Sequence, residues 1–251
     1  MKTASKSDTG LVRLVNEDRA VVQHDLHGFT LAIVADGMGG HQAGDIASQL
    51  AIETVQSELQ HIDSGLGLSA CAAELAAAVR TANRKVFDLA SSEDLYQGMG
   101  TTIVAALATS EIIIVAHIGD SRAYLFSADQ VTQLTEDHSL VNELVKSGQI
   151  SPEEANSHPR KNVLTRALGT EENVEVEISQ HKWKKGDIVL MCSDGLSNLV
   201  DEETIKSAVY AEADLEQKAS RLVASALEAG GDDNITVVLL ENDESGRNGE
   251  G

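Results

Sequence analysis

The sequence predicts an α+β fold of four layers, α-β-β-α: two mainly antiparallel sheets face each other, and an amphipathic helix pair covers each outer face. Two observations predict it. Strand-like and helix-like segments come in separate blocks instead of alternating singly, which disfavours a parallel, doubly wound sheet. The links between successive strand-like runs are mostly short, as in antiparallel arrangements. No stretch resembles a linker, so we expect one domain over residues 1–240 and a flexible polar tail over 241–251.

Three strand-like runs and two helical segments make up the N-terminal block. The expected strands are residues 3–9, 19–25 and 29–35, and the third is an apolar run that stops at Asp36-Gly37. The pattern then changes period. Apolar side chains recur on one face of residues 42–60, and again at steps of three and four over 68–89. This periodicity predicts two amphipathic helices.

Short strands resume after residue 100, and a polar insertion interrupts them. The expected strands are residues 101–108, 112–118, 122–127 and 130–134. Their tight links favour an antiparallel meander. Residues 136–162 are polar and helical in pieces, with a typical helix start at Ser151-Pro152, and we expect them to form a flap beside the body. The remaining expected elements are strands at 163–167, 174–179 and 187–192, helices at 201–209 and 214–229, and a strand at 234–240.

Composition and charge narrow the class of protein. Lysine and arginine number 19 against 40 aspartates and glutamates, which gives a net charge of −21. Such a surface repels phosphate backbones, so the charge disfavours nucleic-acid binding. Cys71 and Cys192 lack the spacing of a zinc site or a disulfide framework. The N-terminus has no apolar leader and no run is long enough to span a bilayer, so we expect a cytoplasmic protein without membrane insertion.

Five aspartates share one sequence context, the edge of an apolar strand, and most adjoin glycine. They are Asp18, Asp36, Asp120, Asp194 and Asp233. A single Asp-Gly is usually no more than a turn. If these strand ends converge, however, the like charges need cations between them.

The type of ligand indicates which cations would bind. The candidate ligands are oxygens without nearby thiolates, which favours Mg²⁺ or Mn²⁺, with Ca²⁺ less suited to chemistry. Two such ions bridged by a carboxylate are the usual arrangement for hydrolysing phosphate esters. Asp36, on the most rigid strand, is the natural bridging candidate. Arg13 could hold phosphate oxygens through paired hydrogen bonds, although a surface ion pair with Glu17 is the simpler explanation of that residue alone.

Seven motifs in a fixed order resemble those of the metal-dependent type 2C protein phosphatases, in particular the bacterial Ser/Thr phosphatases that oppose membrane-bound kinases. The motifs are Thr9-Gly10 with Arg13 to Asp18; Val34 to His41; Met99-Gly100-Thr101-Thr102; His117 to Arg122; Asp137-His138-Ser139; Cys192 to Leu196; and Gly231 to Thr236. Each motif is weak by itself, but the ordered set is specific and leaves only the C-terminal tail uncovered.

The resemblance implies roles for individual residues. Asp36 would be shared by two Mn²⁺ or Mg²⁺ ions, and the carbonyl of Gly37 would ligate one of them. Asp194 and Asp233 would bind the second ion, and Asp120 with Asp194 a third, weaker one. The remaining implied roles are Asp18 as a direct or water-mediated ligand, Glu17 and Asn234 behind the ligands, and Arg13 as the phosphate clamp.

One position departs from the pattern of eukaryotic members, which often carry histidine two residues after the bridging aspartate. Met38 stands there and cannot donate a proton, a departure that bacterial members commonly share. The proton for the leaving group would then come from a metal-bound water or from a side chain such as His41. We interpret His117 as a core histidine and His138 as a residue that starts the flap.

The resemblance implies hydrolysis of phosphoserine and phosphothreonine in proteins by a metal-activated water, in opposition to a Ser/Thr kinase. We therefore expect phosphorylated proteins as partners, including a cognate kinase, and a monomeric enzyme. Two alternatives remain open from the residues. One is a phosphoesterase for small phosphorylated metabolites, and the other is a non-catalytic scaffold, although the filled ligand positions disfavour the scaffold.

Overall fold

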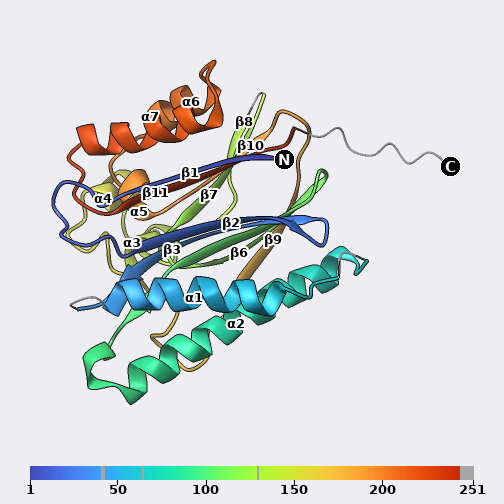
Figure 1. Cartoon of the computed structure of the whole chain (residues 1–251). Helices are drawn as coiled ribbons and strands as arrows, with labels where there is room; N and C mark the ends of the chain where they lie inside the picture. The colour runs from blue at the N-terminus through green and yellow to red at the C-terminus, as the bar shows by residue number, and fades with distance from the viewer. Residues whose placement is uncertain (41–42, 64, 129, 244–251) are drawn as a thin grey trace.

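The computed structural model describes residues 1–40, 43–63, 65–128 and 130–243, and these form two facing antiparallel sheets (Figure 1). The first has the order β1 (Lys2–Asp8), β11 (Ile235–Glu241), β10 (Ile188–Cys192), β7 (Arg122–Ser127) and β8 (Gln130–Gln133). The second has the order β2 (Asp18–Leu26), β3 (Phe29–Met38), β5 (Ile103–Ala108), β6 (Ile112–Ile118) and β9 (Glu177–Lys182), and short β4 (Gly100–Thr101) pairs with β3.

Helix pairs cover the two outer faces, as the sequence predicts. Figure 1 shows α1 (Ala43–Leu59) and α2 (Leu68–Ser92) against the β2–β9 sheet, and α6 (Glu202–Tyr210) and α7 (Leu215–Glu228) against the β1–β8 sheet. Each layer pair has its own apolar core. The four-layer α+β prediction is therefore confirmed.

A third core fills the space between the sheets, and it explains why β3 is continuously apolar from Leu31 to Ala35. Leu31, Ile33 and Ala35 face the helix side, whereas Ala32 and Val34 pack between the sheets. Because neighbouring residues of a strand point to opposite faces, a strand that is buried on both faces shows no polar alternation.

The predicted four-strand meander is wrong, because the chain changes sheets half-way along it. β5 and β6 pair in one sheet, and β7 and β8 pair in the other. The crossover between β6 and β7 is the segment Gly119-Asp120-Ser121. Four short strands with tight links look alike in sequence whether or not they share a sheet. The crossover carries Asp120 to one end of the sandwich.

Other predicted bounds of strands and helices also differ from those in the structure. The expected strand at 163–167 is absent, since this segment makes only one isolated bridge, Leu164 with Ser139, and the following Leu168 makes another with Thr101. β9 lies about three residues later than expected, and a short helix, α5 (Asp194–Ser197), was not foreseen. β11 includes Glu241, and Asn242 still bonds to Asp187, so the ordered chain passes the expected start of the tail.

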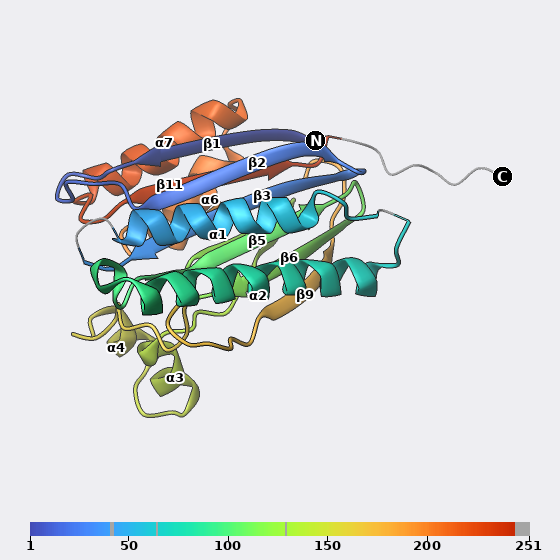
Figure 2. The same ribbon diagram turned by 60° about the horizontal axis from the view of Figure 1, so that its bottom comes forward.

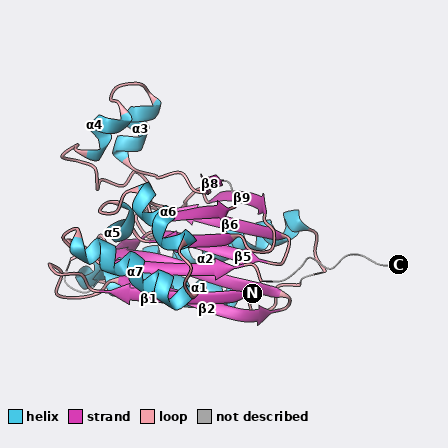
Figure 3. Cartoon of the chain, turned by 90° about the horizontal axis from the view of Figure 1, so that it is seen from above, coloured by secondary structure: helices cyan, strands magenta, loops and turns pink. Residues whose placement is uncertain are grey.

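The insertion at 136–162 contains two short helices, α3 (Leu140–Lys146) and α4 (Pro152–Asn156). Ser151 caps α4 in a full capping box with Glu154, as the sequence indicates. Figures 2 and 3 show both helices standing out from the body at one end of the sandwich. Among the described residues, no helix has the length and apolarity needed to cross a bilayer.

Candidate metal centre

Two of the predicted aspartates face each other across neighbouring strands. In the antiparallel pair of β2 and β3, Asp18 stands directly opposite Asp36, so their side chains lie on the same face of the sheet. Thr102 fixes the backbone of Asp36: its Oγ1 accepts the Asp36 N–H at 3.0 Å, and its own N–H donates to the Asp36 carbonyl at 2.8 Å. Asp36 is therefore held on a rigid strand, as the sequence suggests.

The other sheet contributes Asp194 and Asp233 to the same end of the sandwich. Asp194 is the first residue of α5 and is separated from β10 by Ser193 alone, and Asn198 donates to its Oδ2 at 2.9 Å. Asp233 precedes β11, and its Oδ1 accepts the Asn234 N–H at 2.8 Å. Asp36 and Asp194 line the same cleft, which brings aspartates of the two sheets together.

The aspartates line one cleft of about 190 Å³, together with residues of the flap's C-terminal side. Its walls comprise Arg13, Glu17, Asp36, Gly37, Met38, Gly39, Thr102, Asp120, Asn162, Leu164, Asp194, Asp233 and Asn234. Asp18 lies buried beneath, 1% exposed, and its Oδ2 accepts a hydrogen bond from Ser193 Oγ at 2.7 Å. Sequence positions as far apart as Asp18 and Asp233 thus meet at one place.

Burial is the main cause that raises the pKa of the carboxyl groups of Asp18, Asp36, Asp120 and Asp194. Burial raises the pKa of Asp18 to about 7, and a hydrogen bond from Ser193 opposes the rise. Burial, followed by the charge of Asp194, raises the pKa of Asp120 to about 8. For Asp36, burial and then the charges of Asp18 and Asp194 place the pKa well above its ordinary range. Such repulsion is what bound cations would remove.

Gly37 permits a close approach between β3 and the start of α1. A Cβ at this position would lie 2.0 Å from the Gly44 carbonyl oxygen and 2.7 Å from the Glu17 carbonyl oxygen. Ser48 Oγ of α1 donates to the Glu17 carbonyl at 2.6 Å, and a Cβ at Gly44 would lie 2.7 Å from Glu17 Oε1. Glu17 therefore anchors the N-terminus of α1 behind the site, as its predicted position behind Asp18 suggests.

Arg13 reaches the cleft from the loop between β1 and β2. Its Nη2 lies 2.7 Å from Asp233 Oδ2, and half of its side chain is exposed. The carboxylate partner is thus Asp233 and not the neighbouring Glu17. A guanidinium at the mouth of an acidic cleft can bind an anion there, and the half-exposed side chain of Arg13 leaves room for that contact.

Asn234 connects the site to this loop. Its Nδ2 donates to the Thr9 and Val15 carbonyls at 2.9 and 3.0 Å, and its Oδ1 accepts the Glu17 N–H at 2.8 Å. The residue after the predicted ligand Asp233 therefore holds both ends of the segment that carries Arg13.

The donor set fits divalent cations that prefer oxygen. It consists of carboxylates with a backbone carbonyl, and Asp18 Oδ1 is buried without a hydrogen-bond partner among the described residues. An unpartnered buried carboxylate oxygen is costly unless a cation or water meets it. In the described part of the chain, the aspartates do not gather three ligand oxygens within 4.8 Å of one another. That spacing suits ions that keep several waters of their own better than a fully enclosed ion.

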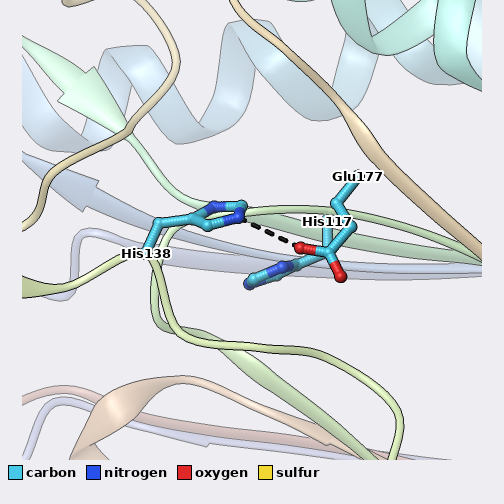
Figure 4. A group of neighbouring side chains, drawn as sticks. All are labelled: His117, His138 and Glu177. Carbon is cyan, nitrogen blue, oxygen red and sulfur yellow. Dashed lines mark hydrogen bonds and ion pairs between the residues drawn. The ribbon is translucent and has the colours of Figure 1, made fainter. Parts of the chain in front are cut away.

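A compact group of potential ligand atoms does occur elsewhere, at His117, His138 and Glu177 (Figure 4). Hydrogen bonds hold His138 and Glu177, whereas both ring nitrogens of His117 are buried without a hydrogen-bond partner among the described residues. His138 Nδ1 accepts the Gly119 N–H at 3.0 Å, and its Nε2 lies 3.2 Å from both Glu177 Oε2 and Arg166 Nη1. The His117 ring stacks on His138 with centroids 4.7 Å apart. Burial, then the charge of His138, lowers the pKa of His117 to about 3, so it stays neutral. These residues brace the crossover beside Asp120.

Comparison with known proteins assigns the chain to a family. A sequence profile described as protein phosphatase 2C matches residues 12–229. The chain belongs to the protein phosphatase 2C family. The serine/threonine phosphatase stp of Listeria monocytogenes is 40% identical over 243 residues, which is 97% of this chain and 96% of the relative. The serine/threonine protein phosphatase PstP of Mycobacterium tuberculosis is 42% identical over 96% of this chain, which matches 45% of that longer protein.

Solved structures of the family share the fold. The serine/threonine phosphatase of S. agalactiae superposes with a TM-score of 0.90 at 39% identity and covers 95% of this chain and 98% of its own. The catalytic domain of PstP, described in complex with two manganese ions, superposes with a TM-score of 0.84 at 39% identity, covering 96% and 97%. This chain is accordingly a PP2C-type serine/threonine phosphatase, and these relatives do not favour the small-metabolite alternative.

The structure brings together every predicted site residue that it describes; His41 lies outside the described residues. Sequence reasoning missed two supporting side chains, Ser193 against Asp18 and Arg122 against Asp137. Arg122 binds Asp137 through two nitrogens, Nη2 at 2.6 Å and Nε at 2.9 Å, and ties the end of the crossover to the start of the flap. Both lie inside the quoted motifs, so the signal was present, but only their contacts reveal what they do.

Proposed function

We propose that this PP2C chain uses the acidic cleft to hydrolyse phosphoserine and phosphothreonine in proteins with Mn²⁺ or Mg²⁺. The observation that supports it is the convergence of aspartates from both sheets beside Arg13 in one cleft. We assign Asp36 as the ligand shared by two ions and Gly37 as a carbonyl ligand. Asp194 and Asp233 complete the second position, with Asp18 as a direct or water-mediated ligand. Asp120 and Asp194 would hold a third, weaker ion.

The bound ions would supply an activated water and compensate the charge of the phosphoryl group. The protein's own residues position the reactants. Arg13 would bind phosphate oxygens once its contact with Asp233 loosens, since a metal at Asp233 competes for the same carboxylate. Ser193 and Thr102 keep Asp18 and Asp36 in place through the hydrogen bonds described above. Asn234 holds the Arg13 loop, and Glu17 fixes the start of α1.

The proton for the serine or threonine leaving group needs a donor, and Met38 cannot supply it. We propose His41 or a water in the cleft. A His41→Ala variant separates these sources by its effect on two substrates. If His41 donates, turnover of a phosphopeptide falls while turnover of an aryl phosphate, whose leaving group needs little protonation, is spared. Equal turnover of the phosphopeptide by both proteins assigns the proton to water.

The flap would select protein substrates. A second cavity of about 480 Å³ runs between the body and the flap, with Asp120 and Asp194 at its inner end and Ser139, Asn142 and Pro152 among its outer walls. This geometry supports one catalytic domain over residues 1–240 with residues 136–162 as its mobile flap. Exchanging the flap for that of another family member should change protein-substrate preference and spare aryl phosphate turnover. Equal loss on both substrates would contradict the assignment.

We further propose a monomeric, cytoplasmic enzyme that opposes a Ser/Thr kinase, and that the phosphorylated kinase is itself one of its substrates. The decisive experiment assays a panel of phosphoserine and phosphothreonine peptides with Mn²⁺ or Mg²⁺, and with a chelator as control. We expect metal-dependent peptide hydrolysis. A wide margin in kcat/KM in favour of small phosphorylated metabolites over all peptides would overturn the proposed substrate class.

A further inference from the structure

The segment around Arg13 exposes an unusual amount of apolar surface. Leu11, Val12, Leu14 and Val15 are 69%, 63%, 98% and 41% exposed, respectively. They account for four of the nine large hydrophobic side chains that are exposed among the described residues. Single exposed apolar side chains are ordinary, but a cluster of four within five residues marks an interaction surface. We call these four side chains the apolar rim.

The rim is exposed although its backbone is firmly held. The two Asn234 hydrogen bonds to Thr9 and Val15 fix both ends, and the Leu11 N–H donates to the Gly231 carbonyl at 2.8 Å. Gly10, with φ of +79°, packs so closely that a Cβ there would lie 2.2 Å from the Asp233 carbonyl oxygen. A loop secured in this way presents its side chains in a fixed place instead of fraying. The apolar rim is thus a preformed surface.

We propose that the apolar rim binds apolar side chains that flank the phosphorylated residue of a protein substrate. This inference rests on the proposed function and adds a substrate preference to it. Val12 and Leu14 are the chain neighbours of Arg13, so their Cα atoms lie about 3.8 Å from that of the phosphate clamp. An extended peptide advances about 3.3 Å per residue. A substrate whose phosphate meets Arg13 therefore brings its neighbouring residues over the rim.

The negative charge around the Arg13 loop also favours apolar substrate side chains at the rim. Asp8, Glu17, Asp232 and Asp233 surround the loop in the chain or in space, and the protein carries a net charge of −21. Acidic residues beside the phosphate would be repelled, whereas apolar side chains meet no such cost and gain by leaving water. The phosphoprotein is also the macromolecule that the enzyme must bring to Arg13, so the rim continues the substrate site.

The test compares two phosphothreonine peptides that are identical except for the two residues on each side of the phosphothreonine, which are leucine and valine in one and serine in the other. Wild-type enzyme, Leu14→Ser and the control Leu68→Ser are assayed on both peptides and on 4-nitrophenyl phosphate. Leu68 is 42% exposed at the first residue of α2, which starts at the opposite end of the sandwich (Figure 1). Both substitutions replace an exposed leucine, so general effects on folding are matched.

We expect the wild type to prefer the apolar peptide about 5- to 10-fold in kcat/KM, the scale of one or two apolar contacts. Leu14→Ser should lower this ratio, mainly by raising KM, and leave the serine peptide and the aryl phosphate unchanged. Leu68→Ser should keep the wild-type ratio.

Three results would overturn the inference. The wild type could show no preference between the peptides, or Leu14→Ser could match Leu68→Ser on every substrate. Alternatively, Leu14→Ser could alter the elution volume of the protein in gel filtration without altering the peptide ratio, which would assign the rim to self-association. Turnover of the aryl phosphate without turnover of either peptide would instead refute the proposed protein substrates.

Discussion

The chain contains two apolar runs that lead into Asp-Gly, and the backbone continues differently after each of them. After Asp36-Gly37 the chain stays extended as β3 to Met38 and pairs with β4. After β10, Asp194-Gly195 instead opens the short helix α5. Both aspartates nevertheless reach the same cleft, because β3 and β10 belong to facing sheets and end at the same side of the sandwich.

The two glycines share a purpose despite this difference. A Cβ at Gly37 would lie 2.0 Å from the Gly44 carbonyl oxygen, and one at Gly195 would lie 2.0 Å from the Asn234 carbonyl oxygen. Each glycine lets another segment pack against the strand end directly behind its aspartate. What the repeated motif encodes is therefore close packing behind a carboxylate, and the local backbone conformation is free to vary.

The largest effect should come from removing either carboxylate charge. We expect Asp36→Asn and Asp194→Asn each to reduce Mn²⁺-dependent hydrolysis of 4-nitrophenyl phosphate by about 10³-fold or more, because each removes a proposed metal ligand. Circular dichroism should show an intact fold, since the change also relieves buried like-charge repulsion. Near-normal activity of Asp36→Asn would contradict the assignment of Asp36 as the ligand shared by two ions.

Alanine at the two glycines tests whether close packing is common to both ends. Gly37→Ala and Gly195→Ala should each lower the free energy of unfolding by about 2–4 kcal/mol, since a backbone oxygen occupies the space of the new Cβ. Urea unfolding with a chelator present measures this without metal binding. Gly67→Ala is the control, because its Cβ would meet nothing within 4 Å. A small effect at only one of the two glycines would show that the ends are built differently.

The sheet that carries Asp36 also carries the buried His117, on β6. This histidine should make the free energy of unfolding depend on pH. Its pKa of about 3 in the folded protein is below the ordinary 6.5, so the unfolded chain takes up the proton first. This contribution to stability is complete above pH 6.5 and is lost as the pH falls towards 3. We expect His117→Phe to reduce that loss by about 2–4 kcal/mol. The difference between wild type and variant in urea unfolding isolates it, and identical pH profiles would refute the buried neutral state.

The smallest effect should come from Asn198, which contacts only the Asp194 side of the comparison. Asn198→Ala removes the hydrogen bond to Asp194 Oδ2 and should raise the Mn²⁺ concentration for half-maximal activity by up to about 10-fold. Activity at saturating Mn²⁺ should change little. If kcat falls instead while the metal requirement is unchanged, Asn198 acts on the substrate and not on the Asp194 ligand.

Most elements were predictable because their signals are local. The helices α1, α2, α6 and α7 follow from apolar periodicity, and the capping box at Ser151 marks α4. The strand expected at 163–167 failed for a non-local reason. Its residues suit a strand, but the chain offers them only one isolated bridge, at Leu164, so no ladder forms.

By itself, the sequence determined the α+β class, the order of most elements, the family and the identity of the candidate ligands, because periodicity and ordered motifs are properties of neighbouring residues. Only the tertiary structure decided that β6 and β7 lie in different sheets and that the aspartates meet. Arg13 and Asp233, which form one ion pair, are 220 positions apart. The exposure of Leu14 was likewise invisible, since burial depends on which distant segments pack against a side chain.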